Sequence, residues 1–350
     1  MKLEIIKGSE NYTCQVIKLP NKIPVKGLDN LVEVNYQGNS CLVGKDSDEN
    51  LPYLFFPAEC KISKDFLSAN NLFRHNNLNS DDTKKGFFED SCRVKAVKFK
   101  GVISSGFVIP LSSLDCINNN LKIGDEFNSI DGIEICSKYL KPADKKPGMS
   151  NPRTKVIDSI VDSRFVPEHM DTSHLLKNIH KLSLNDYVAI TYKLHGTSAR
   201  FYNTLIQKPL STVDKIAKFF GVKVEETQYD YIAASRRVVK SVGFEALPNK
   251  NHFFTSGDLW SEVGKEFFEG NLNKGEAVYC EIIGKTYTGE AIQHGYTYQL
   301  EKPKVYIYRI SNINEQGIEI DLSYHQMKER AFQLGIEVCP ELFYGTLKEY

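Results

Sequence analysis

The stretch ITYKLHGTS at residues 190–198 decides how the fold and the chemistry of this chain are predicted. Its apolar, β-branched start predicts a strand over residues 188–192 that brings Lys193 to the strand end, and Gly196 predicts a turn directly afterwards. A lysine at such a place is held beside a ligand instead of moving freely in solvent. Its amine attacks phosphorus only when it is uncharged, a state that neighbouring cations and partial desolvation favour. Lys193 is therefore our candidate nucleophile.

The bulk composition is that of a soluble globular protein with two domains. The chain has 350 residues, 41% of them hydrophobic and 25% charged, and its formal net charge is +0, so nucleic acid would have to bind to local basic patches. No apolar run approaches the ~20 residues that span a membrane, and the start of the chain lacks the apolar core of a signal peptide. The eight cysteines are scattered without a C-x-x-C pair, which argues against a disulfide framework and fits a cytoplasmic location.

The first 140 residues are predicted to be mostly β-structure. Strand patterns occur at residues 12–18, 31–36, 41–45, 92–100, 102–109 and 125–130, and Gly101 predicts a hairpin between two of them. Many short strands with long loops indicate a small barrel or sandwich, and an OB-like β-barrel is our candidate. Residues 141–155 hold three prolines, a glycine and five cations without an apolar period, so we assign them as the linker to a second domain at residues 156–350.

One predicted strand of the first domain has a basic face. Arg93, Lys95, Lys98 and Lys100 recur at nearly every second position, a pattern that we interpret as one basic face of the strand. Such a face is usually just solvated. The alternative is a track for the phosphate backbone of a nucleic acid.

The second domain is predicted to mix helices and strands. We expect residues 199–202 to pair back with the strand at 188–192, and residues 277–283 and 304–310 to be buried strands. Helices are predicted within residues 171–182, 210–220, 251–268 and 323–334. In the second of these, the apolar residues fall on one helical face, which we interpret as a stripe that packs in the core.

Three further segments follow Lys193 in an order that suits nucleotide chemistry. Arg200, Arg236 and Arg237 are candidates for neutralising a phosphate, and Glu281, at the end of an apolar strand, can accept hydrogen bonds from ribose hydroxyls. Tyr306 or Tyr308 offers a ring that can stack on a base. Each signal is weak alone, and their joint order carries the prediction.

These segments resemble the motifs of the covalent nucleotidyltransferase superfamily, which contains RNA ligases, DNA ligases and capping enzymes. KLHG at 193–196 is similar to the nucleophile motif K-x-D-G, YCEIIG at 279–284 to the third motif, and residues 305–310 to the strand that follows it. The resemblance implies Lys193 as nucleophile and Glu281 as the ribose-binding carboxylate. It implies nucleotide contacts from Thr191, Tyr192, Ser198, Arg200, Arg236, Arg237, Tyr308 as first choice for the adenine ring, and Tyr306 as second.

Within this superfamily the chain resembles the fifth RNA ligase family, which includes phage homologues. The supporting segments are the hairpin at 93–111, residues 171–179 and residues 334–345. The resemblance implies an α+β chain in which an OB-like domain precedes an α/β nucleotidyltransferase domain with antiparallel sheets. It also implies ATP and Mg²⁺ (or Mn²⁺) as cofactors, RNA with 3′-hydroxyl and 5′-phosphate ends as substrate, and no membrane partner. The function would be ligation in RNA repair through lysyl-AMP and adenylylated RNA, in the host cytoplasm if the chain is phage-encoded.

The chain departs from the superfamily pattern in two places. His195 stands where the nucleophile motif usually has an aspartate that holds a metal-bound water, so we expect His195 to contact the metal indirectly. Nothing after Ile310 supplies the fourth or fifth motif, and we expect a truncated or split ligase whose missing motifs come from a partner chain. The alternatives are a non-catalytic protein that binds RNA ends, or an OB-type binding module attached to an unrelated α/β domain.

Overall fold

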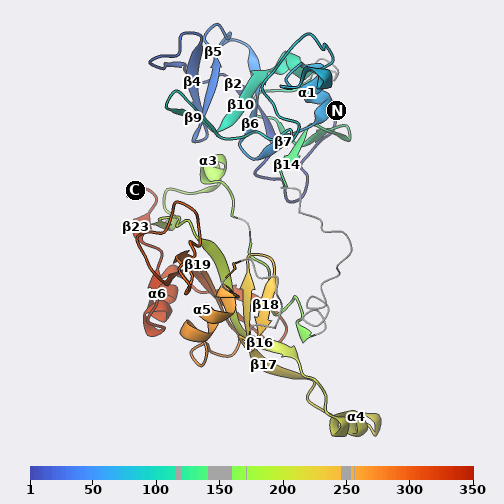
Figure 1. The fold of residues 1–350 in the computed structure, drawn as a ribbon, viewed down its shortest axis with the longest axis vertical. Coiled ribbons are helices and arrows are strands. Elements are labelled where there is room, and N and C mark those ends of the chain that lie inside the picture. Colours follow the sequence, from blue (N-terminus) through green and yellow to red (C-terminus); the bar gives the residue numbers. More distant parts are fainter. Residues whose placement is uncertain (115–119, 141–159, 171, 246–253, 256) are drawn as a thin grey trace. The chain divides into compact units, whose positions relative to one another are not determined.

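The computed structural model describes residues 1–114, 120–140, 160–170, 172–245, 254–255 and 257–350, and Figure 1 shows the chain. It divides into two compact units. Unit 1 contains the described residues of Met1–Lys145 together with Thr172–Lys181, and unit 2 contains those of Lys146–Asp171 and Leu182–Tyr350. The predicted linker at 141–155 lies outside the described residues. No helix in the described ranges is long and apolar enough to cross a membrane.

Unit 1 consists of short, mostly antiparallel strands. They are β1 (Leu3–Glu4), β2 (Cys14–Lys18), β3 (Ile23–Pro24), β4 (Leu31–Tyr36), β5 (Asn39–Gly44), β6 (Pro52–Pro57), β7 (Cys60–Ile62), β8 (Val97–Phe99), β9 (Val102–Ser104), β10 (Gly106–Pro110), β11 (Glu126–Phe127), β12 (Ser129–Ile130), β13 (Ile133–Glu134) and β14 (Cys136–Lys138). The helix α1 (Lys64–Ala69) and two 3-10 turns, Asn76–Leu78 and Leu111–Leu114, complete the unit. Ser63 caps α1 by accepting from the Phe66 amide.

The strands of unit 1 form several small sheets. The largest has the order β10-β6-β2-β11, and β3-β4-β5 is a meander beside it. Two groups of buried side chains fill the unit, one around Phe56 and Phe127 and one around Val34 and Phe55. Over the described residues these sheets do not join into one closed barrel, so the observed architecture is mostly antiparallel β-structure without the predicted closure.

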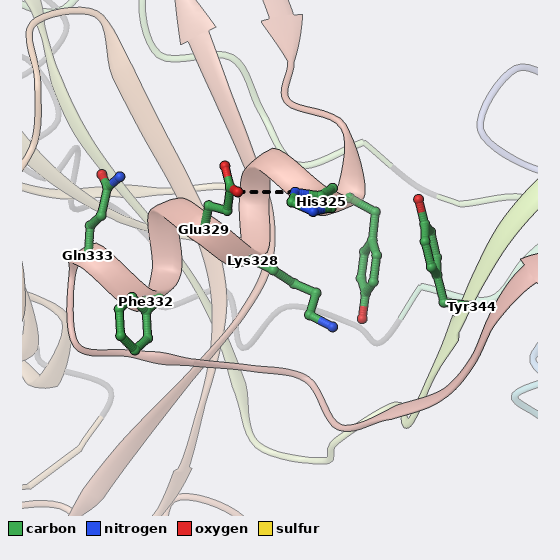
Figure 2. Close-up of a pocket in the computed structure, with 7 residues that line it drawn as sticks. His325, Lys328, Glu329, Phe332, Gln333 and Tyr344 are labelled. Carbon is green, nitrogen blue, oxygen red and sulfur yellow. Dashed lines mark ion pairs between the residues drawn. The ribbon is translucent and has the colours of Figure 1, made fainter.

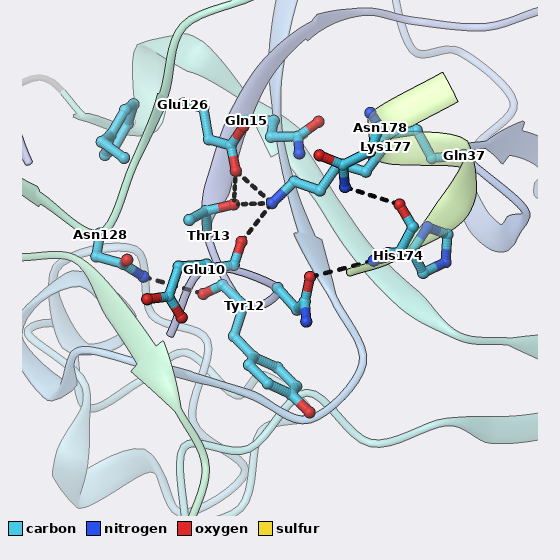
Figure 3. A network of polar contacts seen from close by, with 12 residues as sticks. Glu10, Tyr12, Thr13, Gln15, Gln37, Glu126, Asn128, His174, Lys177 and Asn178 are labelled. Atoms are coloured by element: carbon cyan, nitrogen blue, oxygen red, sulfur yellow. Dashed lines mark hydrogen bonds and ion pairs between the residues drawn. The ribbon is translucent and has the colours of Figure 1, made fainter. Parts of the chain in front are cut away.

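A short helical segment between the two parts of unit 2 belongs to unit 1. It comprises α3 (Leu175–Asn178) and the 3-10 turn Ile179–Lys181. Lys177 anchors it: its ammonium pairs with Glu126 and donates to Thr13 Oγ1 at 2.8 Å and to the Glu10 carbonyl at 2.6 Å (Figure 3). The chain therefore leaves unit 1, returns to it at Thr172 and leaves again, which the predicted division at 141–155 did not include.

Unit 2 is built on one large sheet in the order β18-β17-β16-β19-β20-β21, with β22 beside β20. Its strands are β15 (Tyr187–Thr191), β16 (Thr197–Gln207), β17 (Thr227–Ser235), β18 (Val239–Val242), β19 (Glu276–Gly284), β20 (Pro303–Ile313), β21 (Glu319–Asp321), β22 (Glu337–Val338) and β23 (Glu341–Thr346). Its helices are α4 (Thr212–Phe219), α5 (Leu259–Phe267) and α6 (Tyr324–Gln333).

The two faces of this sheet are covered differently. The helices α5 and α6 can be followed beside the sheet in Figure 1. Their side chains, such as Trp260 and Met327, pack with strand residues such as Phe201 on one face. On the other face Phe165 and Val166 pack against Tyr202 and Tyr279. The site described below lies at one end of this second face.

Two expectations for unit 2 are wrong. β16 does not pair back with β15 after the turn: it lies between β17 and β19, and β15 pairs with β23, from the end of the described chain. The α4 stripe does not pack in a core. The helix lies at the tip of the β16–β17 hairpin, and its residues Val213, Ile216 and Phe220 are 74%, 54% and 76% exposed (Figure 1).

Candidate active site

Lys193 lies in the short connection between β15 and β16, as predicted. The pairing of β15 with β23 fixes the strand before it, and the Tyr192 amide extends this pairing by donating to the Pro340 carbonyl at 2.9 Å. The side chain of Lys193 is exposed and no hydrogen bond or ion pair occupies its ammonium in the part of the chain described. It is thus available to a ligand that binds over the strand end.

Two consecutive amides of this turn are held by side chains from distant parts of the chain. Gly196 N donates to Glu281 Oε1 at 2.9 Å, and His195 N donates to the Tyr298 hydroxyl at 2.8 Å. A Cβ at Gly196 would lie 2.1 Å from the carbonyl oxygen of Ile282, so no other residue fits the turn as it stands. The glycine is therefore required by the close approach of β19.

Glu281 stands at the centre of the site. Across three neighbouring strands it is in register with Ser198 on β16 and Tyr306 on β20, so these side chains share one face of the sheet. Burial raises the pKa of Glu281, while the hydrogen bond from Gly196 and the positive charges of Lys193 and Arg236 act in the opposite direction. Lys193 and Arg236 are therefore both close enough to act electrostatically on one partly desolvated carboxylate.

A β-bulge displaces the predicted adenine-binding aromatic. Tyr279 and Cys280 on β19 face Arg309 and Ile307 on β20, which leaves Tyr308 as an extra residue between them. Its hydroxyl is hydrogen-bonded to Ser198 Oγ at 3.0 Å, and burial raises its pKa.

Tyr306 is the second candidate for the base contact. It remains in register with Glu281, and the ammonium of Lys304 lies 4.9 Å from its ring centroid. Both tyrosines therefore lie beside Glu281, Tyr308 with its hydroxyl engaged and Tyr306 with a cation against its ring.

Arg200 differs from the prediction. It is 1% exposed, and its guanidinium donates to the Ser235 carbonyl at 2.8 Å, to the Tyr202 hydroxyl at 3.2 Å and to the Pro167 carbonyl. Its donors are thus directed at the protein, and this placement argues against a direct contact with a phosphate. Arg200 instead joins the end of β17 to the segment at residues 160–170.

The remaining predicted nucleotide contacts surround the turn. Arg236 and Arg237 are exposed in the connection between β17 and β18, immediately after the Ser235 carbonyl that Arg200 holds. Thr191 faces Glu341 at the end of β15, and the Tyr192 side chain is 55% exposed. Of the basic pair, Arg236 acts electrostatically on Glu281 and so lies at that end of the sheet.

His195, the predicted indirect metal contact, is surrounded by an amide and an aromatic ring. His195 Nε2 lies 3.0 Å from Gln293 Nε2, and its ring meets that of Tyr296 edge-on, with centroids 4.6 Å apart. The described residues contain no group of three or more His, Cys, Asp or Glu side chains that could hold a metal ion.

Sequence reasoning did not find Gln293, Tyr296 and Tyr298, the residues that hold the nucleophile turn. They lie in the connection between β19 and β20, where Tyr298 is 103 positions after His195. The run QHGYTYQ at 293–299, aromatic and polar between two buried strands, is the signal that marks this connection as more than a linker.

The four predicted RNA contacts of unit 1 are largely engaged within the protein. Arg93 donates to Glu59 through Nε at 3.1 Å, and Lys95 pairs with Glu89 at 2.5 Å. Lys100 donates to the Gly27 carbonyl at 2.7 Å, whereas Lys98 on β8 is exposed. The basic face is therefore weaker than the sequence indicates, because the carboxylates of Glu59 and Glu89 neutralise two of its members.

A groove elsewhere in unit 2 is distinct from this site. It has a volume of about 690 Å³ and lies between α6 and Tyr344 of β23 (Figure 2). Its lining includes Tyr324, Lys328 and Phe332, and none of the predicted nucleotide contacts.

Comparison with known proteins agrees with the geometry of unit 2. Residues 186–349 match the family model described as RNA ligase. A lysine-to-methionine mutant of the Naegleria gruberi RNA ligase with AMP and Mn has a TM-score of 0.56 and 15% identity, over 96% of this chain and 86% of that chain. A lysine-to-alanine mutant of the same ligase with ATP and Mn has a TM-score of 0.54 and 15% identity, over 99% and 85%. At this identity the structural likeness establishes the fold, and a comparison with curated protein sequences gave no match.

The fold and the site define unit 2 as a domain of the nucleotidyltransferase type, with a lysine turn beside a buried carboxylate. More particularly, residues 186–349 are similar to the RNA ligase family, and this similarity identifies the chain as an enzyme of the ligase type.

Proposed function

We propose that the chain is an ATP-dependent RNA ligase that joins 3′-hydroxyl and 5′-phosphate ends through lysyl-AMP and adenylylated RNA. The observation that carries the proposal is the placement of Lys193. It follows a paired strand, acts electrostatically on Glu281 as Arg236 also does, and belongs to a turn held by two side-chain hydrogen bonds. A nucleotide bound over this strand end would present its α-phosphate to a positioned amine.

The reaction runs in three displacements. The Lys193 amine attacks the α-phosphorus of ATP, the bond to the β-phosphate oxygen breaks, pyrophosphate leaves and the amine loses a proton to solvent. The 5′-phosphate of RNA then attacks the phosphorus of lysyl-AMP and releases the lysine. Finally, the 3′-hydroxyl attacks the 5′-phosphorus and loses its proton to solvent, AMP leaves with the bonding electrons, and the RNA is joined.

The neighbouring residues have separate roles in this scheme. Glu281 accepts from the ribose hydroxyls with the oxygen that Gly196 does not use, and Arg236 and Arg237 neutralise phosphate charge. Tyr308 or Tyr306 contacts the adenine. A divalent metal, Mg²⁺ or Mn²⁺, would screen the phosphate charges when it binds with ATP, with His195 as an indirect contact.

Unit 1 is proposed to bind the RNA as an OB-like module. Its β8–β9 hairpin exposes Lys98 and its cross-strand partner Ile103 on one face and Phe99 on the other, with Phe99 and Ile103 47% and 58% exposed, so a cation and an aromatic ring are both accessible on this hairpin. The motif resemblance supports placement in the fifth RNA ligase family, including its phage members, and action in the cytoplasm.

Transfer of label from α-labelled ATP to the protein tests the function. With Mg²⁺, the wild-type chain is expected to retain the label under denaturing conditions and the Lys193→Ala variant to retain none. Lys215→Ala, which removes an exposed lysine of α4, should label like the wild type. Label that persists in Lys193→Ala would refute the assignment of the nucleophile, and ATP binding without any label would leave a non-catalytic RNA-end binder. Label from GTP in place of ATP would indicate a capping-type enzyme.

A further inference from the structure

The connection between β19 and β20, residues 285–302, reaches the nucleophile turn from outside. The Tyr298 hydroxyl accepts a hydrogen bond of 2.8 Å from the His195 amide, and Gln293 meets the His195 imidazole at 3.0 Å. The Tyr296 ring meets the imidazole edge-on, with centroids 4.6 Å apart. One residue of the turn is thus contacted on its main chain and its side chain by the same connection.

Tyr298 and Glu281 together fix two consecutive peptide units. Gly196 N is held by Glu281 and His195 N by Tyr298, and Lys193 precedes these amides by three and two residues. A short segment with neighbouring amides fixed has little freedom left in its φ and ψ angles. Of the two acceptors, Glu281 would also meet the ribose, whereas Tyr298 serves the turn alone.

The backbone of the connection is shaped to present this hydroxyl. Tyr298 and Gln299 have φ angles of 52° and 58°, in the left-handed region that residues with side chains rarely adopt. The connection is tied to itself around them: Leu300 N donates to the Thr297 carbonyl at 2.9 Å, and Lys285 pairs with Glu301 at 2.7 Å. Such backbone strain persists where surrounding contacts enforce it and is concentrated at functional sites.

We propose that Tyr298 is a positioning residue for the first chemical step, one that keeps the Lys193 amine in line with the α-phosphorus by holding the His195 amide. The inference rests on the proposed function and extends it to a residue outside the nucleotide pocket. Without the hydroxyl the turn samples more conformations, and the fraction that places the amine for attack falls. ATP itself still binds, because Tyr298 does not belong to the proposed nucleotide contacts.

The Tyr298→Phe variant tests the proposal because it keeps the ring and removes only the acceptor. Lysyl-AMP formation in a single turnover at saturating ATP should slow by about three- to tenfold, the range expected for one lost hydrogen bond. The KM for ATP should stay within twofold and the melting temperature should not change, because Tyr298 is 41% exposed. The matched control is Tyr287→Phe, which removes a hydroxyl that the same connection directs at Glu266 of α5, and its rate should equal that of the wild type.

Two results would overturn the proposal. One is a Tyr298→Phe rate within twofold of the wild type, and the other is an equal loss of rate in both variants. If the wild type forms no lysyl-AMP, the proposed function fails, but the role of Tyr298 can still be tested with periodate-oxidised ATP. The dialdehyde of this analogue forms an imine with a nearby amine, and borohydride reduces the imine to a stable bond. Labelling of Lys193, mapped by mass spectrometry, should then fall at least threefold in Tyr298→Phe, and unchanged labelling would exclude the positioning role.

Discussion

At the scale of single residues, the site depends on the carboxylate of Glu281, which both holds the nucleophile turn and faces the cations proposed to act on the nucleotide. Glu281 accepts from Gly196 at 2.9 Å with one oxygen, and the charges of Lys193 and Arg236 offset part of its burial. A partly buried carboxylate is costly to ionise unless cations or donors compensate it. The compensation here comes from the residues proposed to act on the nucleotide, so the folding of the turn and the binding of the ligand depend on the same group.

The Glu281→Gln variant should separate stability from activity. The glutamine side chain keeps an oxygen for Gly196 but carries no charge, so adenylylation should fall by about 10- to 100-fold as the charged contact to the ribose is lost. Burial raises the pKa of Glu281 in the folded protein above its pKa in the unfolded chain. As the pH rises from the unfolded pKa through the folded pKa, ionisation of Glu281 therefore lowers the stability of the folded state. The variant should therefore melt higher than the wild type at pH 8, and the difference should vanish near pH 4, below the unfolded pKa.

Melting curves of both proteins at the two pH values, together with a labelling assay, check this prediction. A variant that melts lower at pH 8 would show that the charge of Glu281 stabilises the fold. Unchanged adenylylation would show that Glu281 does not bind the ribose.

The residue-scale predictions from sequence fared unevenly for a physical reason. The pattern before Lys193 fixes its place at a strand end, because β-branched residues and a glycine turn are local signals. Whether a cation is free depends on partners far along the chain: Arg200 is enclosed by the carbonyls of Pro167 and Ser235, and Arg93 by Glu59. No local pattern carries that information.

At the scale of elements, the sequence patterns predicted whether a segment is a helix or a strand better than they predicted which elements it packs against. The expected buried strands at 277–283 and 304–310 are β19 and β20, and the helix expected at 323–334 is α6, with Ser323 as its cap. The expected pairing of β15 with β16 is wrong, because Gly196 lies against Ile282 and leads the chain to β19 instead. The pattern of α4 is amphipathic, yet amphipathicity does not say whether a partner surface lies within reach.

Two identical substitutions on different helices make this distinction measurable. Val213 on α4 is 74% exposed and Val263 on α5 is 0% exposed. Val263→Ala should lower the free energy of unfolding by about 2 kcal/mol, because it leaves a cavity in the core of unit 2. Val213→Ala should be neutral or slightly stabilising, since alanine favours the helix and no cavity forms. Urea titrations of the two variants compare them directly, and an equal loss at Val213 would mean that α4 is packed in solution.

At the scale of the whole molecule, the chain connects its two units more than once. It passes from unit 1 to the described residues 160–170 of unit 2, returns to unit 1 at Thr172–Lys181, and resumes unit 2 at Leu182. A proline-rich stretch predicted one linker, at residues 141–155, and these residues lie outside the described part of the chain. The return of the chain to unit 1 could not be predicted from the sequence, because α3 has four residues and is too short for a periodic signal. Its attachment depends on Lys177, whose partners lie far away in sequence.

Lys177 should decide whether this segment stays attached to unit 1. Its side chain is 12% exposed and its ammonium satisfies Glu126, Thr13 and the Glu10 carbonyl together, so Lys177→Ala leaves several acceptors without their donor (Figure 3). We expect a local loss of about 1–3 kcal/mol, the usual value for a buried, charged hydrogen bond, and hence faster amide exchange. Hydrogen exchange followed by mass spectrometry should show this in peptides that cover Leu175–Asn178. The control is Lys181→Ala, because within the described ranges Lys181 donates only to Asn178 Oδ1, at 2.7 Å on the surface. Exchange in this variant should stay as in the wild type. Equal exchange in the wild type and Lys177→Ala would show that the apolar contacts of α3, such as that of Leu176 with the Gly38 turn, hold the segment without the lysine.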